Sequence, residues 1–273
     1  MQSPHIAVID SGIGGLSILA EIEAKLPYLS ISYFMDNLYL PYGTLDQPVL
    51  LERLAAIVEF MLQNNPPDIF VIACNTASTQ SLDFLRQRYG QTFVGVVPAI
   101  KPAAGHTSCG RIGLLATPAT VNGSYLGQLI SDFATDCCVH SVGSCELVHL
   151  AEQRFWNGDA VNDDSEAIAY ILSPLKDIDT LVLGCTHFPL IKHQIRAALP
   201  DHVTLLDSGE AIARRVAFLL ADTIPVSDWA SNKHLYATED LTLNKRQKLS
   251  GMGFSNIDHI ELNVTQTPAL LSH

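Results

Sequence analysis

The chain has 273 residues and carries 28 acidic side chains against 16 Lys and Arg, so its formal net charge is −12 at pH 7. At about 150 residues per domain this length indicates two domains, and 48% hydrophobic residues with only 16% charged residues exclude intrinsic disorder. We expect neither nucleic-acid binding, which needs clustered Lys and Arg, nor a membrane span or signal peptide, so the expected location is the cytoplasm.

Short apolar runs alternate along the chain with segments of helical spacing. In chain order the predicted strands cover residues 6–9, 31–35, 69–73, 93–97, 111–116, 138–142, 180–184 and 203–206. Helices are predicted between them, among them 50–62 and 210–220. Most of the strand runs are continuously apolar, as in strands covered on both faces, so the sequence predicts an α/β fold with parallel sheets.

Two local patterns occur twice in the sequence. Cys74 and Cys185 each follow an apolar run and are followed within two residues by a Thr. The runs that begin at Ile6 and Ile112 both open into a Ser or Thr turn. These repeats predict two similar halves. Because ligands of parallel sheets bind at the carboxyl ends of strands, both cysteine turns would face a shared cleft.

Two thiols on opposite sides of a cleft suit stereoinversion, in which one base removes a proton from a carbon and an acid protonates the other face. The thiolate is the working base and needs a neighbour that controls its protonation. His187, two residues after Cys185, and Asp10, at the end of the first predicted strand, are candidate neighbours. The alternative is that either cysteine is a small buried hydrophobic residue.

The Gly-rich turn at residues 10–17 allows two interpretations. Gly12 and Gly14 match part of the dinucleotide-binding G-x-G-x-x-G pattern, with Asp36 as a possible ribose ligand, but Ser17 occupies the third glycine position. Alternatively, the glycines free backbone N–H groups for a ligand carboxylate. Additional donors would then come from Ser11, Asn75, Thr76, Thr117, Thr120 and Thr186.

Six segments taken together resemble the motifs of glutamate racemases, in the same order, over about residues 5–220. They are residues 10–17, 41–43, 74–78, 97–100, 116–120 and 184–190. The resemblance implies two similar parallel-sheet α/β domains with the active site in the cleft between them. It also implies a racemase that interconverts L- and D-glutamate without pyridoxal phosphate, another cofactor or a metal, and that supplies D-glutamate to peptidoglycan.

The resemblance also implies roles for individual residues. Cys74 would be the base for D-glutamate and Cys185 the base for L-glutamate, assisted by Asp10 and His187 respectively. An auxiliary carboxylate is expected at Glu152, with Glu146 as the alternative. The substrate-binding residues would be Asp10, Ser11, Tyr42, Gly43, Asn75, Thr76, Thr117, Thr120, Thr186 and His187. Asp36 would be structural.

The resemblance predicts a discontinuous first domain of residues 1–97 plus 211–273 and a second domain of residues 98–210. A homodimer is one expected assembly, but the sequence does not decide it, nor does it decide activator dependence or the role of residues 223–273. Two other functions stay open: a related racemase acting on aspartate or another amino acid, and a non-catalytic protein that binds acidic ligands.

Overall fold

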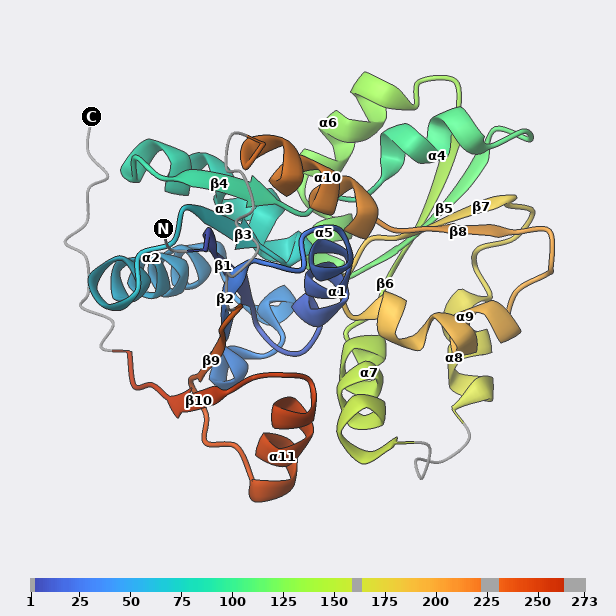
Figure 1. Ribbon diagram of the computed structural model, residues 1–273. Helices are drawn as coiled ribbons and strands as arrows, with labels where there is room; N and C mark the ends of the chain where they lie inside the picture. Colours follow the sequence, from blue (N-terminus) through green and yellow to red (C-terminus); the bar gives the residue numbers. More distant parts are fainter. Residues whose placement is uncertain (1–2, 159–163, 222–230, 263–273) are drawn as a thin grey trace.

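The computed structural model describes residues 3–158, 164–221 and 231–262, and in them the chain forms two parallel sheets covered by helices (Figure 1). The first sheet has the strand order β10-β9-β2-β1-β3-β4 and the second the order β6-β5-β7-β8. All pairings within both sheets are parallel. The predicted fold class, two parallel-sheet α/β units, is confirmed.

The strands and helices have the following bounds. The first sheet contains β1 (His5–Asp10), β2 (Ser30–Met35), β3 (Ile69–Ile72), β4 (Thr92–Gly95), β9 (Lys233–Ala237) and β10 (Asn256–His259). The second contains β5 (Arg111–Ala116), β6 (Cys138–Gly143), β7 (Thr180–Leu183) and β8 (Thr204–Leu206). The helices are α1 (Gly15–Lys25), α2 (Gln47–Asn64), α3 (Asn75–Arg88), α4 (Ile100–His106), α5 (Pro118–Val121), α6 (Ser124–Phe133), α7 (Glu146–Asn157), α8 (Ser165–Leu172), α9 (Lys192–Ala197), α10 (Gly209–Leu219) and α11 (Leu243–Gly251), with short 3₁₀ turns that include η2 (Tyr42–Thr44) and η4 (Phe188–Ile191).

Each of the eight predicted strands is present, and the predicted helices at 50–62 and 210–220 correspond to α2 and α10. The sequence analysis missed β9 and β10. In β9 only the last three residues are buried, and β10 is a short edge strand whose residues are mostly exposed. Neither strand therefore has the continuous apolar run that identified the others.

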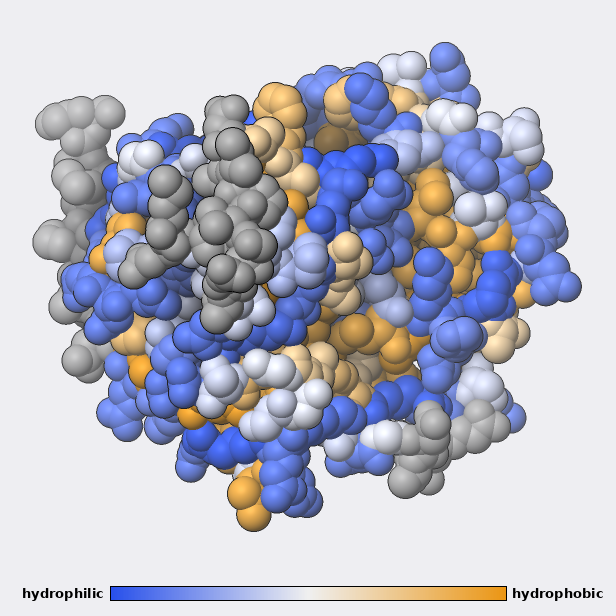
Figure 2. Space-filling model, viewed as in Figure 1, coloured by the Kyte–Doolittle hydropathy of each residue, from blue (hydrophilic) through white to orange (hydrophobic). Residues whose placement is uncertain are grey.

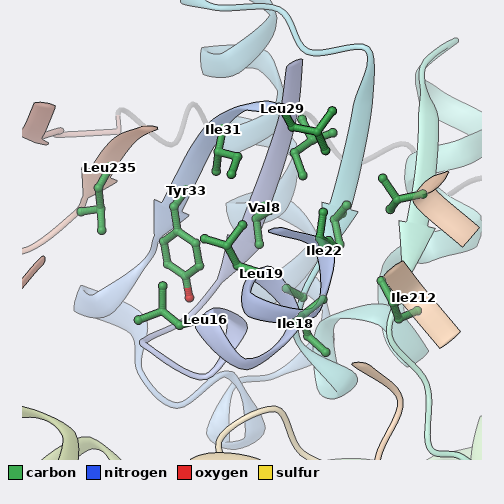
Figure 3. Packing of buried hydrophobic residues seen from close by; sticks show 14 of the residues in the cluster. Val8, Leu16, Ile18, Leu19, Ile22, Leu29, Ile31, Tyr33, Ile212 and Leu235 are labelled. Atoms are coloured by element: carbon green, nitrogen blue, oxygen red, sulfur yellow. The ribbon is translucent and has the colours of Figure 1, made fainter. Parts of the chain in front are cut away.

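The first sheet has a hydrophobic core on each face. Ile6 and Val8 of β1 pack into one cluster with residues of α1 and α10, whereas Ala7 and Ile9 pack into the other with residues of α2. Figure 3 shows the first cluster, with Val8 of β1 beside Leu19 of α1. Burial on both faces explains the uninterrupted apolar run, since each fully buried aliphatic side chain stabilises the fold by about 1.5–3 kcal/mol.

The chain crosses from the first sheet to the second and then returns. Strands β1 to β4 precede the second sheet in sequence, and after it α10 packs against α1 while β9 pairs with β2. The predicted boundary at 97/98 lies between β4 and α4, whereas that at 210/211 lies within α10, two residues after the helix begins. The division into two domains stays a prediction. Residues 1–2, 222–230 and 263–273 of the predicted first domain, and 159–163 of the second, lie outside the described residues.

The visible surface is mostly hydrophilic, and Figure 2 shows apolar residues reaching it in the region of β8. This strand is an edge of the second sheet and its three residues are half-buried. A short strand leaves few unpaired backbone groups at such an edge. Across residues 3–158, 164–221 and 231–262, no helix combines the length and the apolar character that crossing a membrane requires.

Candidate active site

The carboxyl ends of β1, β3, β5 and β7 meet where the two sheets face each other. Asp10 ends β1, Cys74 follows β3, and Cys185 follows β7. Hydrogen bonds join the two halves at this point: Thr186 Oγ1 donates to Asp10 Oδ2 over 2.9 Å, and Ser17 Oγ donates to the Thr186 carbonyl over 2.8 Å. The two cysteine turns therefore lie at one interface between the halves, where open parallel sheets bind ligands.

Cys74 is buried just before α3 in a negatively charged setting. Burial, and then the charge of Asp10, raise the pKa of the Cys74 thiol well above its ordinary value. Burial also raises the pKa of Asp10 to about 6, against the opposing effects of His187, Thr186 and the Gly12 N–H. At neutral pH Asp10 is therefore mostly ionised, and Cys74 is protonated, so it is ready to act as an acid.

Cys185 lies beside His187. Its Sγ is 3.9 Å from His187 Nδ1, and His187 Nε2 is 2.9 Å from Glu152 Oε1. Burial would lower the pKa of His187, but its hydrogen bonds to Cys185 and Glu152 outweigh burial and raise that pKa well above the ordinary value. The resulting imidazolium places a positive charge beside Cys185 Sγ.

Of the two acidic residues considered for the auxiliary role, Glu152 lies against the site. Both are on α7, where Glu146 is exposed in the first turn and Glu152 is 8% exposed. Burial raises the pKa of Glu152, but the hydrogen bond and charge of His187 and the bonds from Ile13 and Trp156 lower it overall. A buried carboxylate that stays ionised can hold the neighbouring imidazolium in its charged form.

The Gly-rich turn before α1 meets Glu152 and His187 of the other half. A Cβ atom on Gly12 would lie 2.0 Å from Glu152 Oε1, and one on Gly14 would lie 2.3 Å from His187 Nδ1. The Gly12 N–H donates to Asp10 Oδ1 over 3.1 Å and the Ile13 N–H to Glu152 Oε1 over 2.8 Å. The backbone N–H groups of this turn were expected to bind a ligand carboxylate. In this conformation they bind the carboxylates of Asp10 and Glu152 instead.

Hydroxyl and amide donors from both halves gather beside the cysteines. Thr76 Oγ1 is 2.8 Å from Thr117 Oγ1 and 3.3 Å from Thr120 Oγ1, so three hydroxyls form a cluster across the interface. Asn75 Nδ2 is buried and has no hydrogen-bond partner among the described residues. With Cys185 and Thr186, Asn75 lines a cavity of about 10 Å³. An unpaired buried N–H₂ group in such a place is a donor available to a ligand.

Of the remaining predicted residues, Ser11 Oγ donates to Asp10 Oδ1 over 3.3 Å, and Gly43 lies against Thr117, because a Cβ on it would be 2.9 Å from Thr117 Cβ. Tyr42 is buried, and its hydroxyl donates to Asp36 Oδ2 over 2.8 Å. The structure thus places the Tyr42 hydroxyl on an internal carboxylate, while the backbone of this turn borders the site.

Arg53 and Trp156 were missed by the sequence analysis. Arg53 forms two hydrogen bonds to Asp36, and the Trp156 indole N–H donates to Glu152 Oε2 over 2.8 Å. Both left a signal in the sequence: Arg53 interrupts the apolar face of the predicted helix 50–62, and Trp156 follows Glu152 by four residues, one helical turn. Neither position in the sequence indicates which carboxylate the side chain contacts.

No group of three or more His, Cys, Asp or Glu side chains in the part of the chain that the structure describes could hold a metal ion. That the protein needs no cofactor or metal stays a prediction, which activity assays without either addition would test.

Comparison with known proteins agrees with this geometry. Residues 32–216 match the family described as Asp/Glu/Hydantoin racemase. The chain is 45% identical to glutamate racemase from Shewanella sp. (strain ANA-3), over 95% of this chain and 97% of that protein, and 47% identical to the enzyme from Vibrio cholerae, over 93% and 95%. A crystal structure of Escherichia coli glutamate racemase in complex with L-glutamate and the activator UDP-MurNAc-Ala superposes with a TM-score of 0.86 at 41% identity, covering 96% of this chain and 99% of that one. The chain therefore belongs to the Asp/Glu/hydantoin racemase family, and within it to the glutamate racemases.

Proposed function

We propose that this protein interconverts L- and D-glutamate by a two-base transfer of the α-proton between Cys185 and Cys74. The observation that carries the proposal is the pair of buried thiols that follow β3 and β7 and lie at one interface between the halves. The relatives named glutamate racemase and the Escherichia coli complex with L-glutamate support glutamate as the substrate.

The two thiols would have opposite tasks in each direction of the reaction. Cys185, beside His187, would remove the α-proton of L-glutamate, while the Cys74 thiol, kept protonated by burial and by Asp10, would protonate the opposite face. With D-glutamate, Cys74 would remove the proton and Cys185 would deliver one. Asp10 would pass a proton to or from Cys74, and the Glu152–His187 pair would do so for Cys185.

The polar groups around the thiols would hold the substrate. We assign the carboxylates and the ammonium of glutamate to Asp10, Ser11, Asn75, Thr76, Thr117, Thr120, Thr186, His187 and the backbone at Tyr42 and Gly43. The unpaired Asn75 amide and the three-hydroxyl cluster supply donors that an acidic protein needs to bind an acid. Preorganised donors around a dry site also stabilise the carbanionic charge that develops on deprotonation.

The first experiment is incubation of the protein with L-glutamate in D₂O without added cofactor or metal. Circular dichroism follows the optical signal, and mass spectrometry detects deuterium at the α-carbon of recovered glutamate. Loss of the signal with deuterium incorporation supports the proposal. Turnover of aspartate but not glutamate would replace the substrate, and binding of glutamate without exchange would indicate a non-catalytic binding protein.

Substitution of the two thiols tests the mechanism. We expect Cys74→Ser and Cys185→Ser each to lower racemisation about 10²-fold or more, because a serine hydroxyl is a far weaker acid and base at neutral pH. Cys138→Ser is the matched control, since Cys138 is exposed on β6 and should leave the rate unchanged. Full racemase activity in either of the first two variants would contradict the two-base assignment.

We further propose that the protein acts in the cytoplasm, where free thiols stay reduced, and that the D-glutamate it forms is used for peptidoglycan. Rescue of a D-glutamate-requiring bacterium by the gene tests this role.

Because the Escherichia coli relative was crystallised with an activator, assays with and without UDP-MurNAc-Ala test activator dependence here. A homodimer stays a prediction that analytical ultracentrifugation decides.

A further inference from the structure

Glu152 has three hydrogen-bond donors, and they come from three different segments. Ile13 N–H and His187 Nε2 both bind Oε1, at 2.8 Å and 2.9 Å, whereas the indole N–H of Trp156 binds Oε2 at 2.8 Å. The first two contacts cross from the Gly-rich turn and the Cys185 turn. The indole is one helical turn away on α7, so it fixes the oxygen that faces away from His187.

Trp156 is packed between its neighbour Phe155 on α7 and α11 from the C-terminal part of the chain. Its ring lies edge-on to Phe155 at 4.8 Å, and Lys245 Nζ of α11 lies 4.9 Å from its centroid. Lys248, also on α11, lies over the Phe155 ring at 4.7 Å and donates to the Phe155 carbonyl. Figure 1 shows α11 beside α7, although about ninety residues separate them in sequence.

We infer that Trp156 is a positioning residue for racemisation, which holds the Glu152 carboxylate against His187, and that α11 fixes the indole from the opposite side. The inference rests on the proposed function of the Cys185 side. Trp156 touches neither thiol, so it acts through Glu152 and His187. Through Trp156, Glu152 and His187, α11 is connected to the Cys185 side of the site although it contributes no residue at the strand ends.

The sign of the pH effect follows from the charges around Glu152. The titratable and charged groups around it are His187, Asp10 and Tyr33, with Lys245 on the far side of the indole. Removal of the indole donor withdraws a bond that favours the ionised form, so the pKa of Glu152 rises. Protonated Glu152 no longer supports the imidazolium, and the acidic limb of the kcat/KM profile therefore moves to higher pH.

The principal test is Trp156→Phe, which keeps an aromatic ring and deletes the N–H. We expect kcat/KM to fall about tenfold, which corresponds to the loss of one hydrogen bond to a charged group, with the acidic limb shifted upward. In the Glu152→Gln background the same substitution should change kcat/KM less than about twofold, because a residue that acts through Glu152 loses its effect there. The control is Tyr170→Phe, which also deletes a polar hydrogen from an aromatic side chain but at a position that is 81% exposed on α8, and it should leave the pH profile unchanged.

An unshifted acidic limb, or an equal loss in both backgrounds, would overturn the inference. An inactive wild type would instead contradict the proposed function, so the two failures are distinguishable. If Trp156→Phe does not fold, the unsubstituted enzyme still decides the question. The chain has two tryptophans, and Trp229→Phe identifies the indole ¹H–¹⁵N signal of Trp156. That signal should titrate with the midpoint of the acidic limb, and a flat titration would exclude the coupling.

Discussion

Ionisation of the buried Asp10 carboxyl lowers the stability of the folded protein. Its pKa is about 6 in the folded protein against an ordinary 3.8, so the folded state binds this proton more tightly than the unfolded state. The contribution to stability is therefore complete below the ordinary pKa and is lost as the pH rises through about 6, which amounts to about 3 kcal/mol at pH 8.

We therefore expect Asp10→Asn to raise the free energy of unfolding by up to about 3 kcal/mol at pH 8, with a difference that shrinks towards pH 4, while racemisation falls. The amide can keep the bonds to Gly12 and Thr186. Urea denaturation of both proteins across this pH range measures the difference. A gain that does not depend on pH would show that ionisation of Asp10 is not its cause.

Residues to which we assign the chemistry were more predictable from the sequence than residues that position them. Asp10, Cys74 and Cys185 follow apolar runs, so their place at strand ends could be inferred from pattern alone. The links from Trp156 to Glu152 and from Arg53 to Asp36 could not, because the rotamer and the tertiary approach decide which partner a polar side chain meets. The orientation of Glu152 likewise depends on the other half of the molecule.

At the scale of elements, Asp36 joins four segments in a buried network. Arg53 of α2 pairs with it at 2.6 Å, Tyr42 of η2 donates to it, and Thr238 after β9 donates over 2.8 Å. Because removal of one partner leaves a buried charge unpaired, we expect Arg53→Met to cost about 3–5 kcal/mol. The control is Arg88→Met, whose exposed pair with Glu59 should contribute less than about 1 kcal/mol.

Thermal or denaturant unfolding of the two Arg variants measures this contrast. Similar stabilities of Arg53→Met and Arg88→Met would show that the network does not hold the Tyr42 turn and β9 against β2. The same network helps to explain why β9 escaped prediction: part of what binds it to the sheet is a polar contact beyond its end and not a long apolar run.

The turn before α1 predicts a second contrast, between glycines. A Cβ on Gly14 would lie 2.3 Å from His187 Nδ1 and 2.8 Å from Thr186 Oγ1. We expect Gly14→Ala to lower kcat/KM at least about tenfold, since the methyl group must displace the imidazole that serves Cys185. Gly127→Ala is the matched control, because it lies on α6 with no atom within 4 Å of the added Cβ.

Gly127→Ala should keep full activity and gain up to about 1 kcal/mol of stability from helix propensity. Racemase assays and unfolding curves of the two Ala variants give both readings. Unchanged activity in Gly14→Ala would mean that His187 tolerates displacement and that its contact with Cys185 is not needed.

For the whole molecule, repeated patterns in the sequence were enough to predict two parallel-sheet halves with facing strand ends. The sequence did not indicate how closely the halves approach. That approach depends on contacts such as Ile13 to Glu152 and Thr186 to Asp10, which join residues far apart in the chain. Each half supplies either the donor or the acceptor of these bonds, so no short stretch of sequence contains both residues.

The closeness of the halves predicts an opening motion. Site donors are bound to the protein's own carboxylates, and the cavity that Asn75 and Cys185 line has a volume of about 10 Å³, at most enough for one water. Glutamate is several times larger, so the halves must separate to admit it. Because both sides of the interface open together, peptides covering residues 11–17 and 185–190 should show the same change in hydrogen exchange.

Saturating glutamate should slow exchange in both of these peptides by a similar factor, while peptides from the buried strands β1 and β2 change little, since burial protects them in open and closed forms. Hydrogen-exchange mass spectrometry at several glutamate concentrations measures this. Protection of only one of the two site peptides would indicate that substrate enters by movement of a single turn. In that case movement of that one turn would break the hydrogen bonds that join Asp10 and Ser17 to Thr186.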